Sequence, residues 1–280
     1  SNPNSQDTDG DGFPDPLEID LGTDPNSVTT FTFNNAGATG KNGPNATQVN
    51  QAYLGTSLQG QVGMVTQGIQ RWTVPVSGSY KIEALGASGG RFNSNAGKGS
   101  KMTGDFELNA SDVLNIVVGQ EGLVAGNRGG GGGGTFVWLE GSGSPLIVAG
   151  GGGGNGQADT NSMDASLTTS GTSDGGNHYS GGTGGNGGAA GFGDSGGGGG
   201  WLSAGGGYGG AKIYQGTGIG GTASGGEGGF GGGGAGEADS SGGGGGYSGG
   251  SGGWYGAGGG GSYNSGANQS SSVRTSYGNG

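Results

Sequence analysis

Residues 129–154, GGGGGGTFVWLEGSGSPLIVAGGGGG, decide the fold because they place two short apolar runs between two runs of glycine. The apolar runs, residues 135–139 and 146–149, are rich in β-branched and aromatic residues, as strands are. The Gly-Ser-Gly-Ser-Pro segment between them is typical of a turn. The sequence therefore predicts two neighbouring strands whose ends continue directly into glycine-rich chain.

Strand patterns of the same kind recur before this segment. Residues 80–85 alternate between apolar and charged side chains, which fits an antiparallel sheet with one wet face. Further strands are expected at residues 28–33, 68–74, 105–108 and 113–118, and a single helical turn is expected near residues 16–21. The expected strands number about seven or eight, enough for a two-sheet β-sandwich of the jelly-roll type.

The composition does not allow one hydrophobic core to extend over the whole chain. Glycine makes up 85 of the 280 residues, and only 28% of the residues are apolar. A globular domain has roughly 45–50% apolar residues and about 7% glycine. All but 11 of the glycines lie after residue 85, without the strict three-residue repeat and abundant proline of collagen. Such a composition is typical of a flexible linker.

The glycine runs nevertheless have two features that linkers usually lack. They lie between convincing strands, and many are followed by a large ring, as at Trp201 and Tyr247. We therefore expect a bundle of polyglycine II helices, which are threefold helices without internal hydrogen bonds. Without Cβ atoms, such helices approach closely enough for the backbone groups of neighbours to pair. Because ordering a backbone costs about 1–2 kcal/mol per residue, the rings and the sandwich must add stability.

The charge and composition argue against nucleic-acid binding, a membrane span and disulfides. Nine Lys and Arg against 20 Asp and Glu give a net charge of −11, which argues against nucleic acid. No apolar run is long enough to span a membrane, and there is no Cys for a disulfide. The chain begins at Ser1 without Met or a leader, so we expect a processed chain or a fragment.

Residues 7–18, DTDGDGFPDPLE, match the calcium-loop pattern D-x-D-x-[DN]-G-x₅-E at every specified position. Calcium takes about six to eight oxygen ligands. The expected ligands are the side chains of Asp7, Asp9, Asp11, Asp15 and Glu18 and the backbone carbonyl of Phe13. The sequence therefore predicts that Ca²⁺ is the cofactor.

No helix is expected before Asp7, so the loop resembles the repeats of thrombospondin type 3 and of related bacterial surface proteins. The resemblance implies a connector between extracellular modules that bound calcium stiffens. Extracellular loops of this kind bind Ca²⁺ at about 10⁻⁴–10⁻³ M. We accordingly divide the chain into a calcium-binding connector, residues 1–27, and a glycine-rich domain, residues 28–280.

Three sets of segments resemble the glycine-rich extracellular domain of the anaplastic lymphoma kinase and leukocyte tyrosine kinase receptors. They are residues 31–44 with 72–75 and 86–90, residues 131–139 with 145–154, and residues 196–201 with 228–231 and 242–247. The resemblance implies a mainly β fold: a tumour-necrosis-factor-like, jelly-roll β-sandwich fused to polyglycine helices. It carries over neither kinase activity nor the receptors' ligand contacts. The lack of Cys favours a bacterial secreted version.

The chain stops at residues 277–280, where the resemblance implies that bacterial relatives continue into a closing strand. Either this strand has been trimmed, or a neighbouring copy completes the sheet. Both alternatives remain open at this point.

No motif supports catalysis. His178 is the only histidine, and alone it cannot form a hydrolytic triad. Matches to G-x-G-x-x-G arise by chance in such a chain, and none opens a helix after a strand. We therefore expect that the protein is not an enzyme.

Aromatic residues among the glycines are the candidate partner-binding residues. They are Tyr208, Tyr214, Trp254, Tyr255 and Tyr263. Rings on a rigid scaffold with small polar neighbours make recognition surfaces, although the same rings can instead hold the bundle together.

Our main hypothesis is a secreted, adhesin-type cell-surface module. Its partner would be an extracellular protein, a glycan surface or another copy of itself. The alternatives are a structural subunit of an extracellular filament and, third, a carbohydrate- or ice-binding module.

Overall fold

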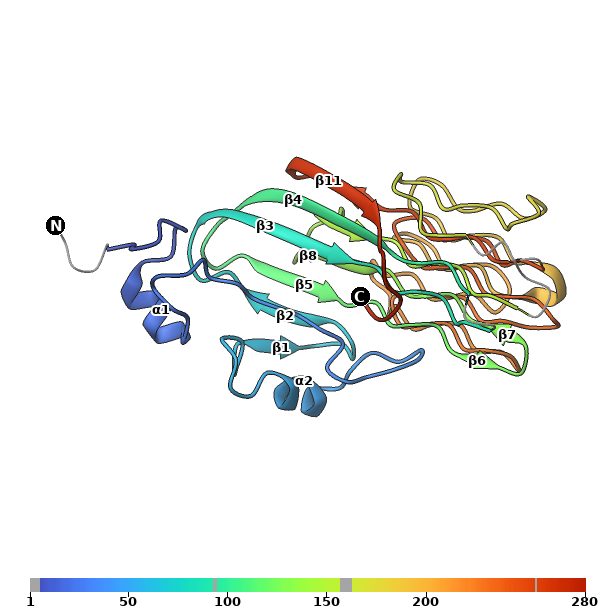
Figure 1. Ribbon diagram of the computed structural model, residues 1–280, viewed down its shortest axis with the longest axis horizontal. Coiled ribbons are helices and arrows are strands. Elements are labelled where there is room, and N and C mark those ends of the chain that lie inside the picture. Colours follow the sequence, from blue (N-terminus) through green and yellow to red (C-terminus); the bar gives the residue numbers. More distant parts are fainter. Residues whose placement is uncertain (1–5, 93–94, 157–162, 255) are drawn as a thin grey trace.

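The computed structural model describes residues 6–92, 95–156, 163–254 and 256–280. Over these residues the protein is mainly β and elongated, with the N-terminal loop at one end and the glycine-rich segments at the other (Figure 1). No helix in the described part of the chain has the length and hydropathy needed to cross a membrane.

The helices are α1 (Asp15–Leu21), α2 (Ala46–Ala52) and a short 3-10 helix (Phe192–Asp194). The strands are β1 (Val62–Met64), β2 (Gln70–Thr73), β3 (Gly78–Leu85), β4 (Ser100–Leu108), β5 (Val113–Val117), β6 (Val124–Ala125), β7 (Arg128–Gly129), β8 (Thr135–Leu139), β9 (Ile147–Ala149), β10 (Tyr263–Asn264) and β11 (Ala267–Val273).

The strands form three antiparallel sheets. The largest has six strands in the order β1-β2-β5-β8-β9-β10, the second has three in the order β11-β4-β3, and β6 pairs with β7. Trp72 and Ile116 of the six-stranded sheet share one buried core with Met102 and Phe106 of the three-stranded sheet. These two sheets thus pack face to face, consistent with a β-sandwich.

Most of the strands expected from the sequence are present. Strands β3, β5 and β8 lie at the predicted positions, and β5 is buried along most of its length, as its nearly continuous apolar run indicates. The helical turn expected at residues 16–21 is α1. Strands β1, β6, β7, β10 and β11 were not expected. The first four have only two or three residues each, and β11 is almost entirely polar.

The strand expected at residues 28–33 is wrong, because the described structure has no strand there. Backbone donors within this segment and just after it bond to side chains instead: Thr29 N–H donates to Asp11, and Asn34 N–H donates to the Tyr53 hydroxyl at 3.1 Å. Phe31 still enters the core, with its ring centroid 4.8 Å from that of Trp72. The apolar alternation therefore identified the positions of Phe31 and Phe33, which pack against the core, but not their backbone conformation.

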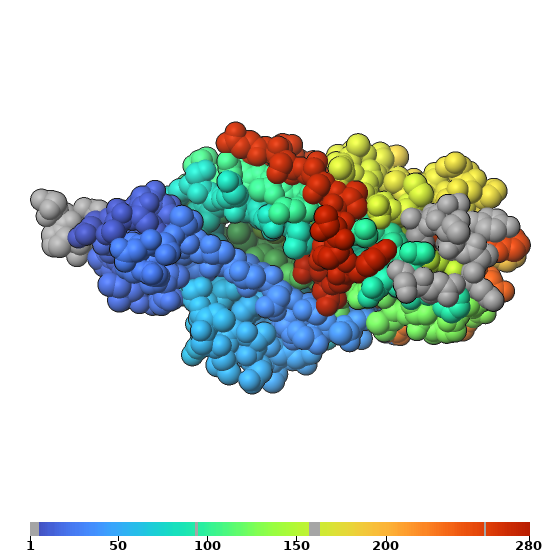
Figure 2. All heavy atoms as spheres, in the orientation of Figure 1, coloured from blue at the N-terminus to red at the C-terminus, as the bar shows by residue number. Residues whose placement is uncertain are grey.

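The C-terminal segment lies across the face of the molecule after β11 (Figure 2). Arg274 Nη1 donates to the carbonyl oxygens of Gly86 at 2.8 Å and Asn279 at 2.6 Å, and Gly280 N–H donates to the Gly119 carbonyl. The chain supplies β11 itself. The outer edge of β11 has no strand partner in the described residues, so completion by a second copy stays a hypothesis.

Backbone hydrogen bonds join the glycine-rich segments to one another. Between β9 and β10 the described residues form only one short 3-10 helix. Gly131 N–H donates to Gly234 O at 2.8 Å, and Gly151 N–H donates to Gly245 O at 2.7 Å. Because these partners are remote in sequence, the described glycine runs are packed chain, unlike a solvated linker.

The close contacts within these segments repeat every third residue. A Cβ added at Gly130 or Gly133 would lie 2.0 or 1.7 Å from a carbonyl oxygen in residues 227–230, whereas one at Gly131 would lie 1.9 Å from Gly243 O. Residues three apart thus face the same neighbouring segment. None of these positions has room for a side chain.

A second buried cluster joins the glycine-rich part to the outer face of the six-stranded sheet. Trp201, which follows a glycine run, packs against Trp138 and Phe136 with ring centroids 5.5 and 6.3 Å away. Phe230 belongs to the same cluster and is fully buried. The rings between the glycine runs therefore fix those runs to the sheet.

We expect Gly131→Ala to destabilise the protein by about 1–3 kcal/mol or more, because its Cβ would overlap Gly243 O. Gly78→Ala is the matched control, since a Cβ there meets nothing within 4 Å. Thermal and urea unfolding of both variants measure the difference. Equal stabilities would contradict the close packing of the glycine segments.

Candidate functional site

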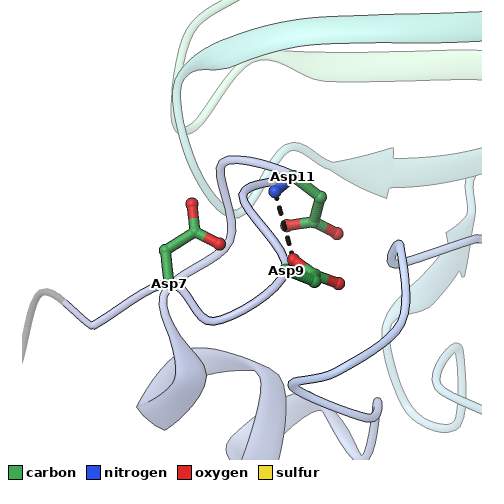
Figure 3. Close-up of side chains that lie close together, drawn as sticks. All are labelled: Asp7, Asp9 and Asp11. Carbon is green, nitrogen blue, oxygen red and sulfur yellow. Dashed lines mark hydrogen bonds between the residues drawn. The ribbon is translucent and has the colours of Figure 1, made fainter.

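The N-terminal loop is held in a tight turn by its own aspartates. Asp7 Oδ1 accepts a hydrogen bond from Gly10 N–H at 2.8 Å, Asp9 Oδ1 from Asp11 N–H at 3.1 Å, and Asp11 Oδ1 from Phe13 N–H at 2.8 Å. Figure 3 shows the three aspartates on this one loop. The sequence pattern thus produces a local fold that the loop's own side chains stabilise.

Three carboxylates gather in this loop. Each of Asp7, Asp9 and Asp11 offers an oxygen, and these oxygens lie within 4.8 Å of one another. Gly12, the sixth residue of the motif, has a φ of 94°, a conformation that favours glycine and turns the chain back. Like charges at this separation repel one another unless a cation lies between them.

Glu18, the twelfth residue of the motif, lies on α1 and is 0% exposed. Its Oε1 accepts a hydrogen bond from Thr29 Oγ1 at 2.9 Å, whereas its Oε2 has no partner in the described residues. Burial raises the pKa of Glu18 above the ordinary 4.5, the Thr29 bond opposes this, and the charges of Asp11, Asp9 and Asp15 add to the rise. A buried carboxylate oxygen without a partner is costly.

Asp15 and Phe13, the remaining motif residues, are placed differently. Asp15 accepts hydrogen bonds from Thr8, through the backbone N–H at 2.8 Å and the hydroxyl at 2.7 Å. The Phe13 side chain is buried between Phe31 and Tyr80, with both ring centroids 5.9 Å away. The structure therefore gathers Asp7, Asp9 and Asp11, and engages Asp15 with Thr8.

The loop is packed against the sandwich through Phe13 and Thr29. Thr29 N–H donates to Asp11 Oδ2 at 2.5 Å, and the hydroxyl of the same residue donates to Glu18. Burial raises the pKa of Tyr80 to about 12, and the nearby Asp11 charge contributes. Sequence reasoning missed Thr29, because the motif specifies positions only within its own twelve residues.

The candidate partner-binding rings fall into two groups. Tyr214 stacks on Trp201 at 5.2 Å, and Tyr263 stacks on Tyr247 at 4.8 Å, so both help to hold the glycine segments in place. Tyr208 and Trp254 are 45% and 41% exposed. Tyr255 lies outside the described residues.

Trp254 forms an exposed pair with Phe192. Their rings stack with centroids 4.3 Å apart, and Phe192 is 43% exposed. Sequence reasoning did not select Phe192, since residue 192 lies far from residue 254 along the chain. A ring brought close only by the fold gives no local signal.

His178 lies in a surface loop held by Asp174. Its Nδ1 lies 3.3 Å from Oδ2 of the buried Asp174, which also accepts hydrogen bonds from the backbone N–H groups of His178 and Tyr179. In the described residues no serine or threonine hydroxyl is hydrogen-bonded to the ring. The Asp174 carboxylate therefore fixes a turn.

Comparison with known proteins gives a partial match. No family model matches the chain. Over 117 residues the chain is 36% identical to the leukocyte tyrosine kinase receptor of Mus musculus, a match that covers 39% of this chain and 13% of the receptor. The chain thus spans a small part of the receptor's length. Part of this mainly β, glycine-rich chain is therefore similar to a tyrosine kinase receptor of the class that its sequence motifs resemble.

Proposed function

We propose that the protein is a non-catalytic binding module displayed outside the cell and that its N-terminal loop binds Ca²⁺. The observation that carries the calcium proposal is Glu18, a fully buried carboxylate with one unpartnered oxygen. The charges of the loop residues Asp11, Asp9 and Asp15 add to the rise in its pKa. The likeness to a receptor supports an extracellular binding role. The partly buried cluster of carboxylate oxygens supports a cation that prefers oxygen ligands.

Asp7, Asp9, Asp11 and Glu18 would hold the ion, with the Phe13 carbonyl and Asp15 completing the site as the motif predicts. Calcium would neutralise the repulsion among these carboxylates. Because Thr29 bonds to both Asp11 and Glu18, a loaded loop would be tightened against the sandwich. Binding would therefore stiffen the connection between residues 1–27 and the domain.

The glycine-rich part is proposed to be a bundle of polyglycine II helices. Its support is the three-residue repeat of contacts and the backbone bonds between remote segments. Such a bundle, with a sandwich of the tumour-necrosis-factor type, would be a rigid adhesin-type platform. It would present Tyr208 and Trp254 to an extracellular protein or glycan, in keeping with their exposure.

A filament subunit is the second candidate, and β11 favours it. Residues 267–272 of this edge strand are exposed, and the strand holds neither charge nor proline. Edge strands usually carry such residues, which prevent pairing with other chains. An unprotected edge allows a second copy to add a strand.

We expect calorimetric titration to give a calcium dissociation constant of about 10⁻⁴–10⁻³ M, which would keep the loop loaded only at extracellular calcium concentrations. Asp9→Asn should weaken binding, since it removes a ligand charge. Asp20→Asn, at an exposed position of α1, is the matched control and should leave binding unchanged. Absence of calcium binding by the wild type would overturn the proposal.

Glu18→Gln should stabilise the calcium-free protein at pH 7. The folded pKa of Glu18 lies above its unfolded value, so its favourable contribution is present below about pH 4.5 and is lost as the pH rises through the folded pKa. Gln removes the buried charge. The same change should abolish the rise in Tm that Ca²⁺ gives the wild type.

Thermal unfolding with Ca²⁺ and with chelator measures both effects. Asp20→Asn should keep the wild-type Tm without calcium and the wild-type rise in Tm with calcium. A lower Tm for calcium-free Glu18→Gln than for the wild type at pH 7 would contradict the cost assigned to the buried carboxylate.

Size-exclusion chromatography over a concentration series separates the two candidate functions. A monomer at all concentrations, with and without calcium, is expected for the binding module. Polymers that grow with concentration and disappear in Ser270→Lys, which charges the β11 edge, would instead favour the filament subunit.

A further inference from the structure

A cavity of about 350 Å³ lies between β10, β11 and the loop at residues 167–169. This volume is within the range of roughly 300–1,000 Å³ typical of small-molecule sites. None of the ten residues that line it is charged. It therefore offers no cationic side chain to a phosphate, sulfate or carboxylate ligand, and its lining favours a neutral one.

The polar character of the cavity comes from an unusual inner face of β11. Ser271 is directly opposite Met102 of β4, and opposite residues of an antiparallel pair project to the same face. Met102 is buried in the core between the sheets, so Ser271 projects to that same side of the three-stranded sheet, although it stays exposed on the edge strand. Inner faces of sandwiches are normally apolar, yet here the inward position is a serine that lines an open space.

Amide side chains in the wall are fixed by hydrogen bonds. Asn264 Nδ2 donates to Thr103 O at 2.8 Å, and Gln269 Nε2 donates to Asn264 O at 3.1 Å. In contrast, the hydroxyls of Thr169 and Ser271, two of the lining residues, make no side-chain hydrogen bond within the described residues. The cavity therefore combines positioned amides with hydroxyl groups that are available to a ligand.

The cavity also has an aliphatic wall. Tyr263 lies at its edge, but the Tyr263 ring stacks on Tyr247 at 4.8 Å and packs against the second cluster, on the outer face of the six-stranded sheet. Leu167, on the covering loop, is 40% exposed. An aliphatic side chain and uncharged hydrogen-bonding groups match a molecule that has C–H groups and many hydroxyls but no charge.

We infer that this cavity binds a neutral saccharide, with C–H groups of the sugar against Leu167 and its hydroxyls bonded to Ser271, Thr169 and the Gln269 amide. The inference rests on the proposed function as a binding module and names the ligand class of one site in it. It does not depend on the calcium loop, which lies at the opposite end of the sandwich from the glycine-rich part (Figure 1).

The test starts with the full chain on an array of neutral, sialylated and sulfated glycans. Calorimetry with the strongest neutral glycan follows. We expect binding to neutral glycans, and we expect Ser271→Phe, which fills the cavity, to weaken it at least about tenfold. Ser272→Phe is the matched control, because the next side chain along a strand projects to the opposite face.

Thr169→Val, which removes one hydroxyl from an exposed loop, gives a second reading if Ser271→Phe fails to fold, and it should also weaken binding. The inference is overturned if the array shows no neutral glycan, if only acidic glycans bind, or if both cavity variants bind like the wild type. A negative array with a positive calcium titration removes this inference and leaves the calcium proposal intact. A positive array with a negative calcium titration leaves this inference intact and removes the calcium proposal.

Discussion

The structure depends on hydrogen bonds between backbone groups of glycine segments that lie far apart in sequence. Gly132 donates to Gly152 and accepts from Gly245, so one residue joins two remote segments. Such bonds need an approach that any Cβ would prevent, as the space around Gly131 and Gly133 makes clear. The glycine content of this chain is therefore a packing requirement, and it limits where side chains can contribute a core.

The side-chain core is accordingly confined to two places. One lies between the two sheets, around Trp72 and Ile116, and the other lies where Trp201 and Phe230 meet the outer face of β8 and β9. The second cluster lets the sheet act as the wall against which the glycine segments are ordered. The burial of this cluster offsets the conformational entropy that the glycine segments lose when they become ordered.

Much of the sheet was predictable, and much of the site was not. The strands around Phe136 and Ile147 followed from β-branched, aromatic runs, and the loop at Asp7 followed from a motif with fixed spacing. Strand β11 was missed because its serines are exposed and show no apolar alternation. Thr29 and Phe192 were missed because their roles arise from contacts made only in the folded chain.

The contact between Ser88 and Gly278 has a consequence for how the protein reaches its native state. Ser88 N–H donates to Gly278 O at 2.9 Å across 190 residues of chain. Contacts of such long range make folding slow, since loop-closure entropy is lost before they form. This contact forms only after residue 278 has left the ribosome, so the segment at Ser88 lacks one of its native partners until then.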